Sequence, residues 1–182
     1  MTLLTILVKA SHGGQRRAID EALKTQFEDL DLKIEILGFT ANKWVQVSLE
    51  GEDEAIATNY IKKTYGTAPF NLDNARTMQT LRGYITKIDN TKQEIYVDVG
   101  VLEPQVAPAV LSVAALQTQL VEGKKLPLEK IAELYGLAEG LPIAVWVNWE
   151  KSSEGELSAE LSAEQAAKFA SWRRSLMDRL II

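Results

Sequence analysis

The sequence contains no cysteine and a single histidine, His12, among its 182 residues. Without cysteine there is neither a disulfide framework nor a thiolate metal site. No apolar run reaches the length that spans a membrane, and the apolar first nine residues, MTLLTILVK, are too short and wrongly flanked for a signal peptide. These absences favour a cytoplasmic protein of a reducing compartment with no membrane partner.

Basic residues are also fewer than acidic ones. Lys and Arg total 20 against 25 Asp and Glu, which gives a net charge of −5, and acidic residues outnumber basic ones both before and after Phe70. A protein that coats nucleic acid by bulk electrostatics needs clustered Lys and Arg that release counterions from phosphates. Any contact with nucleic acid must therefore be local.

Recognisable catalytic patterns are missing as well. The sequence shows no nucleophile–base pair, no metal-ligand spacing and no cofactor fingerprint. The acidic run EGEDE at residues 50–54 lies at a strand end and a helix start, where acids favour the helix dipole. We therefore expect a binding protein rather than an enzyme, with no cofactor and no metal.

The first half of the chain reads as alternating strands and helices. Its patterns predict, in order, a strand at 2–9, a helix at 15–30, strands at 32–39 and 43–51, and a helix at 52–66. The order βαββα predicts an α+β fold with a ferredoxin-like module over residues 1–70. Its closing strand is not evident. The irregular, polar residues 67–79 could supply that strand or serve as a linker, which we place at 71–79.

The second half, residues 80–182, reads as a small β-barrel. Strand patterns occur at 80–89, 93–101, 108–116, 141–150 and 155–161. Five strands with a helical excursion before the fourth predict an OB-type barrel. The excursion is a helix with Pro127 in its first turn and Gly136 at its end. A C-terminal helix begins after Ser162, where Ser162-Ala-Glu-Gln165 forms a capping-box pattern.

The first two barrel strands carry the strongest functional hypothesis. Their alternation permits one consistent inner face, made of Ile85, Ile95, Val97 and Val99. Arg82, Tyr84 and Tyr96 then lie on the open face, and Lys87 reaches the same face from the strand edge. Aromatic rings beside cations on an open barrel face are what single-stranded RNA binders use. The alternative is that both tyrosines pack against the neighbouring module.

Two further groups of basic residues are candidate phosphate contacts. Arg173 and Arg174 in WRRSLMDR form the best local basic patch, although an amphipathic helix with a charged outer face has the same composition.

A weaker candidate is SHGGQRR, where Gly13, Gly14, Arg16 and Arg17 could hold a phosphate at a helix start. It lacks the Gly-Lys-Ser/Thr ending of a P-loop, and the alternative is a flexible turn with solvated arginines.

The stretch GYITKIDNTKQEIYVDVGV, followed by VLSVAAL, resembles the start of an S1-like OB domain. Over nearly the whole chain, segments such as KWVQVSLEGEDEAIATNYI, YVDVGVLEP and LSAEQAAKFASWRRSLMDRL are similar to an uncharacterised archaeal protein family with a C-terminal S1-like domain. The resemblance implies a role in translation or RNA metabolism, and it implies that family members continue past the terminal helix.

Together these observations lead to two functional hypotheses. The first is a non-catalytic RNA-binding protein that contacts RNA or a ribonucleoprotein through its S1-like barrel. The second is a protein-interaction adaptor whose barrel and terminal helix dock a protein partner.

Overall fold

The computed structural model describes residues 1–10, 13–40, 42–153 and 155–174. The chain divides into two compact units, Met1–Pro69 and Phe70–Ile182. Within the described residues, no helix is both long enough and apolar enough to cross a membrane.

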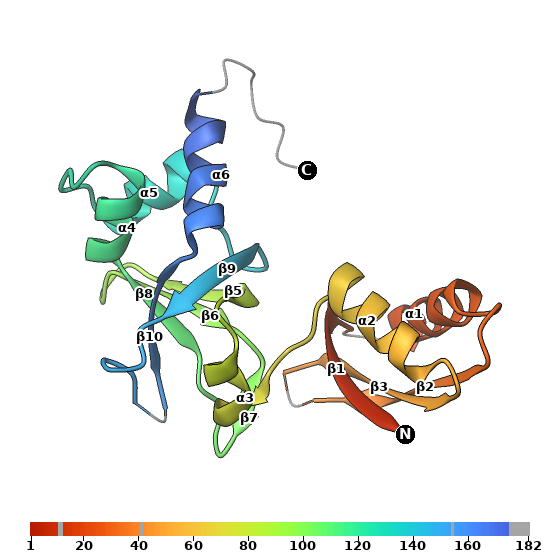
Figure 1. Cartoon of the computed structure of the whole chain (residues 1–182). Coiled ribbons are helices and arrows are strands. Elements are labelled where there is room, and N and C mark those ends of the chain that lie inside the picture. The colour runs from red at the N-terminus through yellow and green to blue at the C-terminus, as the bar shows by residue number, and fades with distance from the viewer. Residues whose placement is uncertain (11–12, 41, 154, 175–182) are drawn as a thin grey trace. The chain divides into compact units, whose positions relative to one another are not determined.

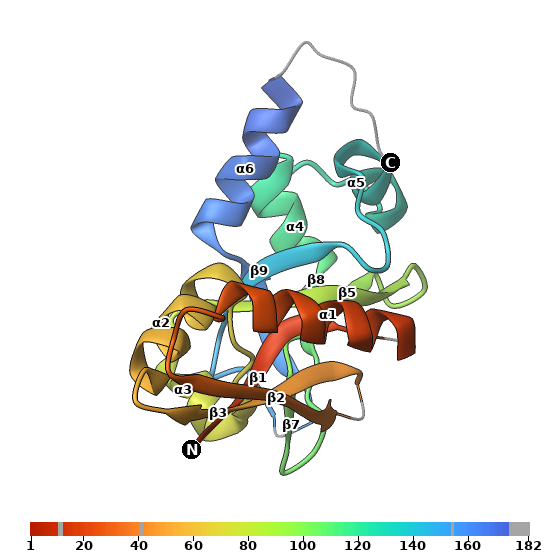
Figure 2. The ribbon, with the colours of Figure 1, turned by 90° about the vertical axis from the view of Figure 1, so that its right-hand side faces the viewer.

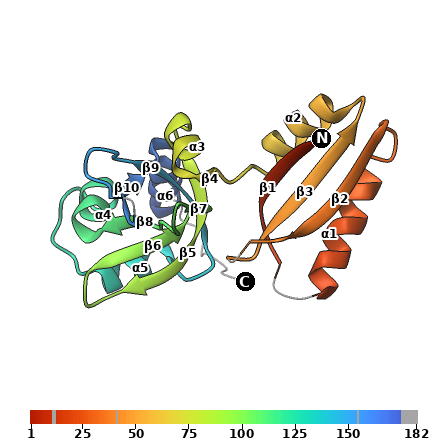
Figure 3. The same cartoon turned by 90° about the horizontal axis from the view of Figure 1, so that it is seen from below.

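The first unit is a three-stranded antiparallel sheet, in the order β1-β3-β2, with two helices on one of its faces (Figures 1 and 3). Its elements are β1 (Thr2–Lys9), α1 (Gly13–Gln26), β2 (Leu32–Phe39), β3 (Trp44–Gly51) and α2 (Glu54–Thr64). This is the predicted order βαββα. Strand alternation places Ile34 and Val47 on the helix-covered face, where they join Leu23 of α1 and Ile61 of α2 in one core.

A short segment after α2 lies along the free side of β1. Thr67 forms an isolated antiparallel bridge with Ile6, the Leu7 N–H donates to the Gly66 carbonyl at 3.1 Å, and the Ala68 N–H donates to the Thr5 carbonyl at 2.8 Å. The next residue is a proline, which has no N–H to continue the pairing. The closing strand that the sequence did not place is therefore a single bridge.

The second unit is a closed five-stranded barrel. Its strands are β5 (Leu81–Asp89), β6 (Glu94–Asp98), β8 (Ala109–Ser112), β9 (Pro142–Val147) and β10 (Leu157–Leu161). Around the barrel they run β5-β6-β8-β10-β9 and return to β5, and every pair is antiparallel except β8 with β10. These are the five strands that the sequence patterns predicted.

Residues 71–79, expected to be an irregular linker, instead begin the second unit. β4 (Phe70–Asn71) pairs in parallel with β7 (Val101–Glu103), and α3 (Leu72–Thr77) follows at once. The Asn71 side chain caps this helix by accepting from the Asn74 N–H at 2.8 Å, and Ala75 is fully buried in the barrel core. A six-residue helix has too few apolar positions to show a period, which is why the sequence suggested a loop.

Side-chain amides tie the helical excursion to the barrel. The excursion is two helices, α4 (Val113–Leu120) and α5 (Leu128–Tyr135), and not the single helix expected. Pro127 is the N-cap that precedes α5 rather than a residue of its first turn, and Gly136 ends the helix as predicted, in the left-handed conformation. Gln119 of α4 both donates to the Leu161 carbonyl at 2.9 Å and accepts from the Leu161 N–H at 3.0 Å. The Gln119 amide thus makes the two hydrogen bonds to Leu161 that a residue of a neighbouring strand would make.

The C-terminal helix α6 (Ala163–Arg174) packs on α4 and α5 (Figure 2). Ser162 caps it as predicted, because its Oγ accepts from the Gln165 N–H at 3.1 Å. Gln165 does not complete a capping box: its Oε1 accepts from the Ala144 N–H of β9 at 3.3 Å, and the Ser162 N–H donates to the Ala144 carbonyl at 3.0 Å. The helix start is therefore fixed to a barrel strand.

Candidate nucleic-acid interface on the barrel

The inner and outer faces of β5 and β6 follow the predicted alternation. The residues assigned to the inner face are all fully buried or nearly so: Ile85, Ile95, Val97 and Val99. On the outside, Arg82 is exposed, and Tyr84 and Tyr96 are half-buried.

A β-bulge brings Lys87 to the same outer face. Ile85 pairs with Val97 and Lys87 pairs with Tyr96, so Thr86 is the extra residue on β5. Strict alternation would have placed Lys87 beside the inward Ile85. Because of the bulge, its ammonium instead lies 5.8 Å from the centre of the Tyr96 ring.

Lys92 approaches the same ring from the turn between β5 and β6. Its Nζ lies 6.0 Å from the ring centre of Tyr96 and donates to the Tyr96 hydroxyl at 3.4 Å, a hydrogen bond that raises the pKa of Lys92. The Tyr96 hydroxyl in turn donates to Glu94 Oε2 at 2.8 Å, and this bond raises the pKa of the phenol. At neutral pH an uncharged tyrosine therefore has two ammonium groups near its ring.

Asp89 builds the turn that carries Lys92. Its Oδ1 accepts from the backbone N–H groups of Thr91 at 3.1 Å and Lys92 at 3.0 Å, and its Oδ2 pairs with Lys87 Nζ at 2.8 Å. The bond to Lys87 is the largest cause that lowers the pKa of Asp89 to about 2. Asp89 thus positions Lys92 through the turn and neutralises the charge of Lys87.

The remaining predicted contacts come earlier on β5 than Lys87. Arg82 pairs in register with Ala144 of β9 and not with β6, and Tyr84 pairs with Asp98, two residues beyond Tyr96 on β6. Asp98 is buried, and its Oδ1 accepts from the Gly100 N–H at 3.0 Å, so it holds the chain turn after β6. Lys92 was missed because nothing in a turn sequence shows which strand residue it will face.

Arg173 and Arg174 are the last two residues of α6, and their side chains lie outside the described part of the structure. The same is true of Ser11 and His12 at the start of SHGGQRR.

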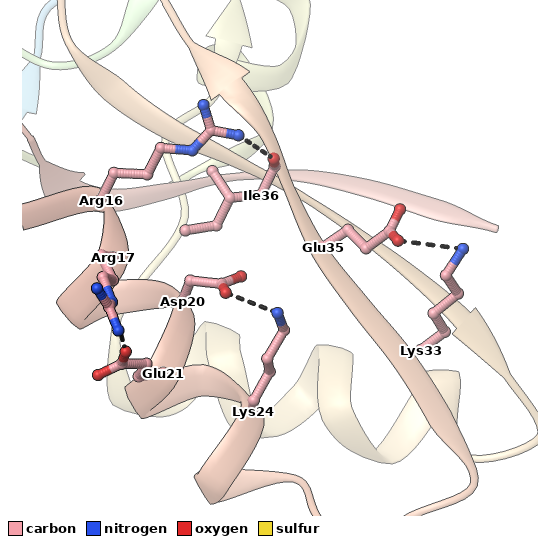
Figure 4. A network of polar contacts seen from close by, with 8 residues as sticks. All are labelled: Arg16, Arg17, Asp20, Glu21, Lys24, Lys33, Glu35 and Ile36. Atoms are coloured by element: carbon pink, nitrogen blue, oxygen red, sulfur yellow. Dashed lines mark hydrogen bonds and ion pairs between the residues drawn. The ribbon is translucent and has the colours of Figure 1, made fainter. Parts of the chain in front are cut away.

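The predicted phosphate contacts on α1 have protein partners (Figure 4). Arg16 donates from Nη2 to the Ile36 carbonyl at 3.2 Å, and Arg17 Nε pairs with Glu21 at 2.8 Å.

Gly13 and Gly14 open the helix, and a Cβ at either would meet nothing within 4 Å. A hollow of about 420 Å³ lies here between α1 and β2. No geometry specific to phosphate distinguishes it, and the phosphate site stays a prediction.

A second hollow, of about 660 Å³, lies on the barrel unit between α3 and β7. Asp73, Glu103 and Arg76 contribute its charges, and the Arg76 guanidinium lies 5.6 Å from the centre of the Trp149 ring. Among the residues that the structure describes, no three acidic or histidine side chains gather where they could hold a metal ion.

Two family models match the chain. Residues 5–70 match the DUF2110 N-terminal domain, and residues 75–173 match the DUF2110 central domain. No curated protein matches the chain.

Proposed function

The chain belongs to the DUF2110 family, and we propose that it is a non-catalytic RNA-binding protein whose barrel takes single-stranded RNA on the outer face of β5 and β6. The role lies in translation or RNA metabolism.

The strand order of the barrel supports this proposal. Numbered along the chain, the five strands close in the order 1-2-3-5-4, the third and fifth are parallel, and helices connect the third to the fourth. We assign this arrangement to an S1-like OB barrel. OB barrels bind oligonucleotides on the face of strands 2 and 3 and on the loop between strands 1 and 2. Here the second strand is β6 and that loop is residues 90–93.

The strand order of the N-terminal unit leads to a second fold assignment. We assign it to the ferredoxin-like fold, because the segment at Thr67, β1, β3 and β2 lie side by side in that order, and both helices lie on one face.

The functional proposal rests mainly on the charged groups that surround Tyr96. Its ring lies on the outer face of β6, with the ammonium groups of Lys87 and Lys92 at 5.8 and 6.0 Å from its centre. Stacking of a base on such a ring is worth about 1–3 kcal/mol and requires no bulk positive charge. Lys92 would contact a flanking phosphate while Lys87 pairs with Asp89, which would give a local binding site on a chain that is acidic as a whole.

The proposal is tested with a labelled single-stranded RNA of about 12 nucleotides, within the range of OB-fold site sizes. Fluorescence anisotropy is measured between about 50 and 200 mM salt, where one phosphate contact by Lys92, with Lys87 held by Asp89, gives a logarithmic slope of about −0.7. The same sequence in a duplex binds more weakly, because its bases cannot stack on Tyr96. Absence of binding at the lowest salt, or equal binding of the duplex, contradicts the proposal.

Asp89→Asn strengthens RNA binding in this scheme. The amide keeps an oxygen that accepts from Thr91 and Lys92 in the turn, but it removes the negative charge that pairs with Lys87. Lys87 is then available to a phosphate, and the salt slope steepens by about 0.7. The measurement is the same anisotropy titration, with Asp73→Asn on α3 as a control for the change in net charge. Equal slopes for wild type and Asp89→Asn would show that Lys87 does not contact RNA.

One observation favours the second candidate function, an adaptor whose barrel and terminal helix dock a protein. Trp146, on the outer side of β9, is 46% exposed. Exposed tryptophan is enriched among residues that dominate protein interfaces. Binding through Trp146 would change little between low and moderate salt, which separates it from RNA binding.

A further inference from the structure

β2 forms one edge of the N-terminal sheet, because the sheet order is β1-β3-β2. Its inner side pairs with β3 from Leu32 to Phe39, and no described strand pairs with its outer side. An edge strand of this length is a template on which another strand can pair.

Backbone directions identify which residues face that edge. The Asp31 carbonyl points to the β3 side, where it accepts from the Asp53 N–H at 3.3 Å. Since successive peptide groups of a strand alternate in direction, Ile34 and Ile36 direct their N–H and C=O groups away from β3. Arg16 contacts the Ile36 carbonyl from this outer side (Figure 4).

We propose that this edge is a homodimer interface in which β2 pairs antiparallel with β2 of a second copy of this chain, about a two-fold axis at Ile34. The axis is perpendicular to the sheet, so the two three-stranded sheets become one continuous sheet. A two-fold contact of this kind joins the same surface of both copies and leaves no further edge at β2. The inference does not depend on RNA binding.

Charge complementarity selects the partner and the register. Lys33 and Glu35 have 66% and 51% exposed side chains on the open face of the sheet, where they form an ion pair at 3.1 Å (Figure 4). With the axis at Ile34, Lys33 of each copy lies opposite Glu35 of the other. An axis at Lys33 or Glu35 would place two like charges opposite one another, which destabilises strand pairing, whereas opposite charges stabilise it.

The available hydrogen bonds make this pairing short. The two Ile34 residues exchange two bonds, and each Ile36 N–H donates to the Leu32 carbonyl of the other copy. The Ile36 carbonyl already accepts from Arg16, and the Leu32 N–H already donates to Leu30 at 2.8 Å. Because so few backbone bonds hold the copies together, the cross-strand charges decide whether they associate.

The test is sedimentation velocity of the full 182-residue chain over a range of concentrations. Wild type forms a dimer, and Lys33→Glu weakens the dimer about ten-fold or more, because by symmetry it creates two like-charge pairs. The double variant Lys33→Glu/Glu35→Lys restores the dimer, since exchanging both charges restores both opposite pairs. Lys62→Glu on the exposed side of α2 is the control with the same change in net charge.

Three results would overturn the proposal. The first is a wild-type chain that stays monomeric at all concentrations. The second is a dimer that Lys33→Glu weakens no more than Lys62→Glu does, which would place the contact elsewhere. The third is a double variant that stays as weak as Lys33→Glu while its circular dichroism matches wild type, which would show that Lys33 meets another partner group.

Discussion

Gly83→Ala lowers the free energy of unfolding of the barrel unit by about 3 kcal/mol or more, at the upper end of the cost of overpacking. A Cβ at this position of β5 would lie 2.2 Å from the Asp98 carbonyl oxygen and 2.9 Å from its carbonyl carbon. Both atoms belong to the backbone of β6, so the two strands must move apart at this point. No rotation of a side chain relieves the contact.

The measurement is urea unfolding followed by circular dichroism. Gly38→Ala is the control, because Gly38 also lies in a strand and a Cβ there meets nothing within 4 Å. It changes stability by less than about 0.5 kcal/mol. If Gly83→Ala unfolds at the same urea concentration as Gly38→Ala, the backbone of β6 does not lie as close to Gly83 as the structure shows.

Phe169→Ala has a comparable effect, a loss of about 3–5 kcal/mol, because it removes a large side chain from a packed core. Phe169 is fully buried, and its ring centre lies 6.0 Å from that of Tyr135 and 5.1 Å from that of Trp172. Tyr135 itself is fixed by its hydroxyl, which donates to the Leu120 carbonyl at 2.5 Å. The substitution therefore loosens α6 and α5 together.

Leu134→Ala on α5 is the matched control, because that side chain is 55% exposed. It costs less than about 0.5 kcal/mol in the same urea titration. Equal stabilities of the two variants would mean that α6 is an appendage and not part of the barrel core.

Periodicity and caps predicted most of the fold. The alternation of β5 and β6 placed Ile85 and Val97 inside correctly, and Pro127 and Gly136 marked the ends of α5. These features are local: a strand buried on one face repeats every two residues, and a helix end needs particular backbone angles. A single sequence carries that information directly.

Features that depend on pairing across the chain were not predictable in the same way. α3 and the Thr67 bridge are too short to show a period, and they form because neighbouring strands supply partners. Lys87 reaches the outer face only because a bulge interrupts the alternation. Lys92 approaches Tyr96 because Asp89 holds the turn, and turn residues alone do not reveal that direction.

Substitution of Tyr96 tests the central claim most directly. Single-stranded RNA affinity is compared by anisotropy for wild type, Tyr96→Ala, Tyr96→Phe and Trp146→Ala. Tyr96→Ala weakens binding about 5- to 150-fold, the equivalent of about 1–3 kcal/mol for one lost stacking platform. Tyr96→Phe keeps the ring and binds nearly as wild type does, and Trp146→Ala, on a strand that does not pair with β6, leaves the affinity unchanged. Unchanged affinity in Tyr96→Ala would contradict the claim that RNA binds on this face.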